Sequence, residues 1–267
     1  MKRTMGTEHA PPSSKSMRKK RLDQLLVDRG LAENRTRAQA LIMSGLVIVG
    51  DKRMDKPGTF VSLEIPISLK GQTHPWASRG GLKLEKGIKI FGICPTNKIA
   101  LDIGASTGGF TDVLLSHGAQ KVYAVDVGYG QLAHRLRIDP RVIVLERTNA
   151  RHLTAHHIPE WVDLIVCDAS FIGLRTVLEK PLSFLRPGGF LIALIKPQFE
   201  VGKAKLGKKG VVRDPDLHHE VCHTIKTWLL ERPGWSVLGI EESPIQGPEG
   251  NTEFLIAAHF QASESPE

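Results

Sequence analysis

The sequence IALDIGASTGGFTDVLLSHGAQKVYAVD, from Ile99 to Asp126, decides the fold of this chain. Its apolar run at 99–103 leads into a glycine-rich turn at 104–109, and glycine lets the backbone turn tightly and approach a ligand closely. Apolar residues then recur at helical spacing, and a second apolar run at 121–126 ends in a carboxylate. Because strand, turn, helix and strand follow in this order, the stretch predicts half of a doubly wound nucleotide-binding unit.

The glycines of this turn follow the pattern G-x-x-x-G-G rather than G-x-G-x-x-G. The second glycine of the usual pattern lets the backbone approach a pyrophosphate, so its absence favours a ligand without phosphates. Asp126 lies 22 residues after Gly104, close to the spacing of about 20 that is typical of a carboxylate on ribose hydroxyls. The turn therefore predicts a site for a nucleoside such as S-adenosylmethionine. An ordinary turn of a parallel sheet is the alternative.

Four more strands are expected in the same domain, at 163–168, 190–196, 235–240 and 253–258. The last two are expected to form a hairpin around a loop rich in glycine and proline. If the final strand runs antiparallel to the others, its first residue, Glu253, lies at the same edge as Asp168 and Lys196. In open α/β sheets that edge is where ligands bind.

Four charged side chains, Lys83, Asp168, Lys196 and Glu253, are therefore candidates to meet beside the nucleoside pocket. A sugar hydroxyl is a weak nucleophile, so its attack on a methyl sulfonium requires a base that takes or shares its proton. Lysine serves as a base where burial and neighbouring positive charge favour its neutral form. A pair of structural salt bridges is the alternative interpretation of the same four residues.

A helix is expected from Asp214, which is a typical capping residue, and Pro215, which is typical of a first turn. This helix contains the sequence HEVCH at 219–223, which matches the H-E-x-x-H motif of zinc peptidases. Its apolar residues define a different face, so His219 and His223 are expected to point to solvent. Two exposed histidines without a third ligand make a poor zinc site, and we predict no metal.

The basic charge of the chain is concentrated at its N-terminal end. Residues 1–90 contain 18 Lys and Arg against 8 Asp and Glu, whereas residues 91–267 contain 18 against 20. This distribution indicates a polyanionic partner such as nucleic acid. A solvated basic surface without a partner is the alternative.

Residues 18–73 predict a small α+β domain, in which Asn34 caps a second helix and short strands lie at 46–49 and 60–65 around a turn at Gly50-Asp51. The pattern RLDQLLVDRGL at 21–31, with the helix and the V-x-V strand that follow, resembles the S4 RNA-binding domain. That family usually has Asn-Gly after the strand. Residues 74–77 are expected to be a linker, and 1–17 and 262–267 are expected to be tails.

The remaining composition excludes other classes of protein. The three cysteines are far apart in the sequence, so no disulfide framework is expected and a reducing, cytoplasmic location fits. The longest plain apolar run, 190–195, is far shorter than the ~20 residues of a membrane span. The first 17 residues lack the apolar core of a signal peptide.

From about Arg18 to Phe260 the chain resembles the TlyA/hemolysin A family, in which an S4 domain precedes an FtsJ-like methyltransferase domain. The resemblance rests on SRGGLK at 78–83, LDIGASTGGF at 101–110, DASFI at 168–172 and KPQFEVGK at 196–203. It implies a Rossmann-like α/β domain with a mostly parallel sheet and an antiparallel last strand. It also implies methyl transfer from S-adenosylmethionine to ribose 2′-hydroxyls of ribosomal RNA, with cytidine as the target.

The resemblance identifies Lys83, Asp168, Lys196 and Glu253 with the catalytic tetrad of FtsJ-like enzymes, and Lys196 with its general base. The predicted cofactor-binding residues lie in the glycine turn and after the strands: Asp102, Gly104, Ser106, Gly108, Gly109, Phe110, Asp126, Asn149 and Asp168. The predicted RNA contacts are basic residues of the small domain and one residue at the start of the larger domain: Arg21, Arg35, Arg37, Lys52, Lys56 and Arg79.

Two rival functions stay open at this point. One is a membrane-active hemolysin, although no segment of the sequence supports insertion. The other is an RNA-binding ribosome-assembly factor that keeps the cofactor fold without turnover, against which the complete tetrad argues.

Overall fold

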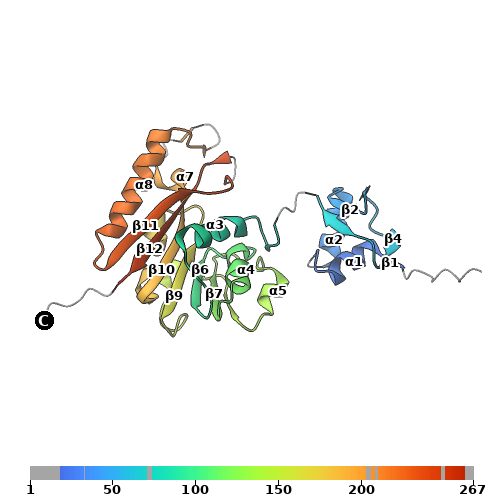
Figure 1. Ribbon diagram of the computed structural model, residues 1–267, viewed down its shortest axis with the longest axis horizontal. Coiled ribbons are helices and arrows are strands. Elements are labelled where there is room, and N and C mark those ends of the chain that lie inside the picture. Colours follow the sequence, from blue (N-terminus) through green and yellow to red (C-terminus); the bar gives the residue numbers. More distant parts are fainter. Residues whose placement is uncertain are drawn as a thin grey trace, which may run out of the picture. The chain divides into compact units, whose positions relative to one another are not determined.

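The chain forms two compact units, and the boundary between them in the sequence lies between Thr73 and His74. A computed structural model describes residues 19–32, 34–70, 74–202, 206–207, 210–247 and 250–261 (Figure 1). The expected tails, 1–17 and 262–267, lie outside the described residues.

The larger unit is built on a seven-stranded sheet with the order β11-β12-β10-β9-β6-β7-β8. The strands are β6 Ile99–Ile103, β7 Lys121–Val125, β8 Val142–Leu145, β9 Val162–Cys167, β10 Leu185–Ile195, β11 Trp235–Glu242 and β12 Phe254–Phe260. Neighbouring strands from β8 to β10 are parallel, whereas β12 is antiparallel to both β10 and β11. The predicted mostly parallel sheet with an antiparallel end is therefore confirmed.

Helices cover both faces of this sheet. Alternate residues of each strand point to opposite faces, and the buried apolar residues accordingly form two clusters. One cluster packs against α3 Gly81–Phe91, α4 Gly109–Ser116 and α5 His134–Arg137, and the other against α6 Leu174–Leu178 and α8 Pro215–Leu230. Figure 1 shows α8 beside β11 and β12, away from α4 and α5. A short helix, α7 Pro197–Glu200, follows β10 directly.

The predicted start of α8 is confirmed. The Asp214 side chain accepts a hydrogen bond of 3.0 Å from the Asp216 backbone N–H, and Pro215 occupies the first turn. The helix buries Val221, Ile225 and Leu229, while His219 and His223 are exposed, as the helical spacing predicts. None of the helices among the described residues is both long and apolar enough to cross a bilayer.

The smaller unit packs two helices, α1 Leu22–Asp28 and α2 Arg35–Met43, against short strands. One sheet has the order β3-β2-β5, formed by Lys52–Met54, Val47–Val49 and Ile67–Leu69, and a second joins β1 Lys19–Arg21 to β4 Phe60–Ser62. The Asn34 side chain caps α2 as predicted, because it accepts a hydrogen bond of 2.8 Å from the Arg37 N–H.

The expected strand at 60–65 needs correction. Only Phe60–Ser62 is a strand, and it pairs with Lys19–Arg21 rather than with Val47–Val49. The backbone bond from Ile65 N–H to the Ser62 carbonyl, 3.3 Å long, turns the chain at 63–65. This turn lets the next segment, β5, pair with β2 instead.

The residues expected to be a linker, 74–77, belong to the larger unit. The Trp76 side chain is 8% exposed and packs against the core that includes α3 and α4. Its indole N–H donates to Glu85 (3.1 Å), and the Ala77 N–H donates to the Asp112 carboxylate (2.7 Å).

This packing predicts that Trp76→Ala destabilises the larger unit by about 3–5 kcal/mol, because it opens a cavity and leaves Glu85 without the indole donor. All four tryptophans of the chain follow residue 73, so tryptophan fluorescence during urea unfolding reports on this unit. Trp161→Ala is the matched control, since that side chain is 63% exposed and should change stability by about 0.5 kcal/mol or less. Equal effects of the two substitutions would contradict the anchoring role.

Candidate active site

A cavity of about 320 Å³ lies at the carboxyl-terminal edge of the parallel strands. Its lining comes from the start of α3, from the glycine turn, from the loop after β9 and from the single residues that follow β10 and precede β12. The lining residues are Ser78, Arg79, Gly80, Lys83, Gly104, Ala105, Ser106, Thr107, Gly109, Phe110, Asp168, Ser170, Lys196 and Glu253. This set brings together all four predicted catalytic residues and five of the predicted cofactor residues of the glycine turn and β9.

The glycine turn requires glycine for two reasons. Gly104 has a φ of +83°, and a Cβ there would stand 2.9 Å from the Ala169 Cα. Gly108 has a φ of +95°, and a Cβ would stand 2.3 Å from the Leu136 side chain. L side chains rarely adopt this conformation and have no room here. The turn therefore brings the Gly104 backbone directly against the loop after β9, and the Gly108 backbone against Leu136.

Asp126 follows β7 and holds the turn in place. One carboxylate oxygen accepts the Ser106 N–H (2.8 Å) and the other accepts the Gly128 N–H (2.7 Å). Asp126, Ser106, Gln131 and Glu146 also line a second, small cavity beside the turn. The sequence did not reveal the backbone partners of this carboxylate, because they depend on the conformation of two loops.

Asp102 lies behind the turn and is fully buried. The Thr111 hydroxyl donates to Oδ2 (2.6 Å), while Oδ1 has no hydrogen-bond partner among the residues that the structure describes. Burial raises the pKa of Asp102 to about 7. Asn149 caps a short helical turn at Ala150–His152 by accepting the Arg151 N–H (3.1 Å), and it is outside the lining of both cavities.

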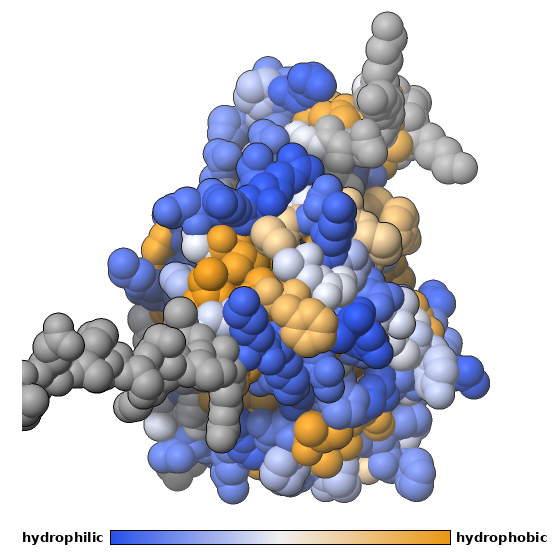
Figure 2. Space-filling view, turned by 90° about the vertical axis from the view of Figure 1, so that its right-hand side faces the viewer, coloured by the Kyte–Doolittle hydropathy of each residue, from blue (hydrophilic) through white to orange (hydrophobic). Residues whose placement is uncertain are grey.

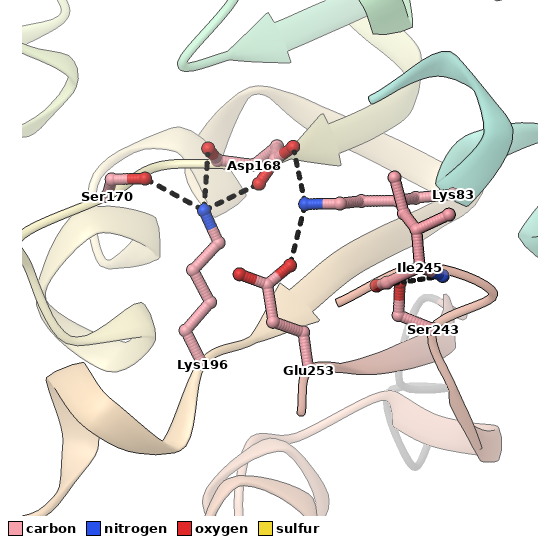
Figure 3. A network of polar contacts seen from close by, with 7 residues as sticks. All are labelled: Lys83, Asp168, Ser170, Lys196, Ser243, Ile245 and Glu253. Carbon is pink, nitrogen blue, oxygen red and sulfur yellow. Dashed lines mark hydrogen bonds and ion pairs between the residues drawn. The ribbon is translucent and has the colours of Figure 1, made fainter. Parts of the chain in front are cut away.

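The four charged side chains form one network (Figure 3). The Lys83 ammonium contacts Glu253 Oε2 at 2.6 Å and Asp168 Oδ2 at 3.3 Å, and the Lys196 ammonium contacts Asp168 Oδ1 at 2.6 Å. Lys83, Lys196 and Glu253 are 6%, 5% and 1% exposed. Since a buried charge is costly unless it is paired, each group depends on its neighbours.

Lys196 makes two further contacts that the sequence did not predict. Its ammonium donates to the Ser170 hydroxyl (2.9 Å) and to the Asp168 carbonyl (3.2 Å). Ser170 was missed, although its place in the sequence DASF, two residues after Asp168, is a signal that could have found it. The loop after β9 thus surrounds the lysine nitrogen with oxygen atoms.

The predicted RNA contacts lie in both units. Arg37, Lys52 and Lys56 are exposed, whereas Arg21 and Arg35 form ion pairs with Asp23. Arg79 is exposed and lines the active-site cavity.

The face seen in Figure 2 is mostly hydrophilic, with apolar residues gathered in patches among the hydrophilic ones. Within the described ranges, no three His, Cys, Asp or Glu side chains are arranged to hold a metal ion.

Comparison with known families matches both units. The FtsJ-like methyltransferase family matches residues 76–260, and the S4 domain matches residues 20–64.

Individual relatives cover most of the chain. YqxC of Bacillus subtilis, described as a candidate rRNA methyltransferase, is 47% identical over 91% of this chain and 86% of its own length. The 16S/23S rRNA (cytidine-2'-O)-methyltransferase TlyA of Mycobacterium tuberculosis is 45% identical over 90% of this chain and 89% of its own. The solved structure of a candidate hemolysin from Streptococcus thermophilus is 41% identical, with a TM-score of 0.71 over 93% of this chain and 90% of that one.

The raised pKa of Asp102 predicts a specific pH dependence of stability. An ordinary Asp in the unfolded chain loses its proton near pH 3.9, whereas folded Asp102 keeps it up to about pH 7. The contribution of Asp102 to the free energy of unfolding is therefore greatest in acid and falls by up to about 1.4 kcal/mol per pH unit until pH 7. Above pH 7 it stays level.

Asp102→Asn removes this titration while keeping an acceptor for Thr111. The difference in unfolding free energy between this variant and the unsubstituted protein should shift in favour of the variant from pH 5 to 7 and then stay constant. Urea unfolding followed by tryptophan fluorescence, without added cofactor, measures this difference. Parallel stability curves from pH 5 to 8 would show that Asp102 does not hold its proton in the folded state.

Proposed function

Because this chain belongs to the TlyA/hemolysin A family of S4-domain proteins with an FtsJ-like methyltransferase domain, we propose that it methylates ribose 2′-hydroxyls of ribosomal RNA, with S-adenosylmethionine as the donor. The proposal includes cytidine as the target nucleoside. One observation carries it: a network of two buried lysines, buried Glu253 and partly exposed Asp168 lies in the same cavity as the glycine turn.

The residues of the cavity fit this cofactor. The glycine turn brings backbone, without side chains, to the cavity wall at Gly104 and Gly109. Asp126 lines the small second cavity on the other side of Ser106, and its carboxylate would accept hydrogen bonds from the ribose hydroxyls. When bound, the cofactor supplies a methyl group made electrophilic by its sulfonium sulfur. Asp102, Ser106, Gly108, Phe110 and Asn149 stay predicted members of this site.

Lys196 is the proposed general base. In its neutral form its nitrogen would take the proton of the 2′-hydroxyl while the hydroxyl oxygen bonds to the methyl carbon. The bond from that carbon to sulfur would break, and the sulfur would keep the electron pair as a neutral thioether. The ammonium that results is held by the Asp168 carboxylate, 2.6 Å away, and by the Ser170 hydroxyl. These acceptors are already oriented toward the nitrogen before the proton arrives, so little reorganisation accompanies the transfer.

Lys83 and Glu253 have a supporting role in this proposal. Lys83 shares the Asp168 carboxylate with Lys196, and Glu253 fixes Lys83 through a contact of 2.6 Å. Lys83 thus brings a second positive charge to the carboxylate that the proposed base contacts.

The smaller unit is the proposed RNA anchor, since it matches the S4 domain. Together with residues up to 90 it holds the basic excess of the chain. Phosphate contacts of this kind supply affinity independently of sequence. Arg79 lines the active-site cavity and is proposed to contact RNA there.

Asp126→Ala should weaken S-adenosylmethionine binding at least tenfold, because two charge-assisted hydrogen bonds of about 1.5–3 kcal/mol each are lost. Isothermal titration calorimetry measures this affinity, and urea unfolding separates it from a loss of folding. An unchanged dissociation constant would remove Asp126 from the cofactor site.

Lys196→Arg should reduce methyl transfer by about 10²–10⁴-fold, the usual effect of losing a general base. Arginine keeps the positive charge but does not give up its proton in proteins. Mass spectrometry of nucleosides from ribosomal RNA incubated with protein and cofactor measures the 2′-O-methyl product, and calorimetry checks that cofactor affinity is kept.

Lys121→Arg is the control for this substitution, because Lys121 is paired with Glu160 at 2.6 Å and begins β7. It should leave transfer unchanged. Near-normal transfer by Lys196→Arg would refute the base, and the absence of 2′-O-methyl nucleosides with the unsubstituted protein would refute the function itself.

A further inference from the structure

The smaller unit contains a buried carboxylate with no part in the active site. The Asp23 side chain, in the first turn of α1, has no exposed surface. The two arginines paired with it are much more open, with exposed side-chain fractions of 36% for Arg21 and 58% for Arg35. The anion is therefore inside and its cations are at the surface.

Asp23 receives four hydrogen bonds from three side chains. Arg21 donates its Nε to Oδ1 (3.1 Å) and its Nη2 to Oδ2 (2.9 Å). The Arg35 Nε and the Gln39 Nε2 both donate to Oδ2, at 2.9 and 3.1 Å. An ionised carboxylate accepts about four hydrogen bonds, so its capacity is filled by groups of β1 and α2.

This geometry holds the two guanidinium groups next to each other. Both bond to the same oxygen of Asp23, and each keeps N–H groups that the carboxylate does not use. The arginines are thus ordered before any ligand binds.

Stability alone does not explain the arrangement. Burying a carboxylate is costly, and an apolar residue of similar size often stabilises a fold as well or better. The hydrogen bonds from Arg21 hold the pKa of Asp23 well below its usual range, so the group stays charged. The charge keeps two arginines oriented, which an apolar residue cannot do.

We propose that Asp23 is a positioning residue for RNA binding, which orients Arg21 and Arg35 as a paired guanidinium site for one backbone phosphate. The inference rests on the proposed function, in which the smaller unit binds ribosomal RNA. Guanidinium groups bind phosphate through parallel N–H donors, and the exposed Arg37, Lys52 and Lys56 give the same unit further positive charge.

The direction in which one substitution changes RNA affinity tests this proposal. Asp23→Asn removes a negative charge from a basic unit, so electrostatics alone predicts tighter RNA binding. Asp28→Asn is the matched control, because Asp28 ends the same helix, is exposed and is paired with Lys20. In the full chain, binding to transcribed 16S and 23S rRNA should weaken at least threefold for Asp23→Asn and stay equal or tighten for Asp28→Asn.

A second pair of variants keeps the buried charge and its other partners. Arg35→Lys preserves the charge but loses the planar donor group, while Asp23 stays in contact with Arg21 and Gln39. It should weaken binding at least threefold, because the parallel N–H donors are lost. The slope of log affinity against log salt should stay the same, because lysine still neutralises phosphate charge. Arg53→Lys should leave binding unchanged, because Arg53 donates to the Ser44 carbonyl and has no part in the Asp23 cluster.

The outcomes are distinct. Tighter binding by Asp23→Asn, or unchanged affinity for Arg35→Lys, would overturn the positioning role while leaving RNA binding intact. Failure of the unsubstituted protein to bind either rRNA would instead overturn the proposed function of the smaller unit. If Asp23→Asn fails to fold, as judged by circular dichroism, the Arg35→Lys result decides.

Discussion

Two lysine side chains are buried at one edge of the sheet, and the arrangement of the larger unit depends on the need to pair their charges. Lys83 comes from α3 and Lys196 follows β10, while the carboxylates follow β9 and precede β12. These groups lie far apart in the sequence and meet only if every strand has its observed direction. The antiparallel insertion of β12 between β10 and β11 is decisive, since it brings Glu253 to the edge where the parallel strands end.

Much of this could be predicted from sequence, because the signals are local or follow from strand direction. The stretch from Ile99 to Asp126 predicts the turn, helix and strands that the structure contains, and the period of α8 separates its buried residues from His219 and His223. The tetrad could be predicted as a group, since residues at the ends of parallel strands share an edge. The sequence could not predict which lysine contacts which carboxylate, because these distances depend on packing.

The features that the sequence did not reveal depend on contacts between distant segments of the chain. Nothing in the composition of residues 60–65 reveals that the chain turns after Ser62. The strand β4 ends there because it pairs with β1, which lies about 40 residues earlier in the chain. Residues 74–77 are expected from the sequence to be a linker, but Trp76 is buried against residues of α3 and α4. Ser170 and the backbone partners of Asp126 are likewise defined by loop conformation.

The two units use buried ion pairs in opposite ways. In the larger unit the cations themselves are buried, and both are lysines, the basic side chain that can give up its proton when its surroundings favour the neutral form. In the smaller unit only the carboxylate is buried, and its partners are exposed arginines, which keep their charge and present planar donors. A buried, exchangeable proton is what a general base requires, and an exposed, permanent charge is what a phosphate contact requires. The proposed base and the proposed phosphate site therefore differ in which member of the ion pair is exposed: the cations are buried in the larger unit and exposed in the smaller one.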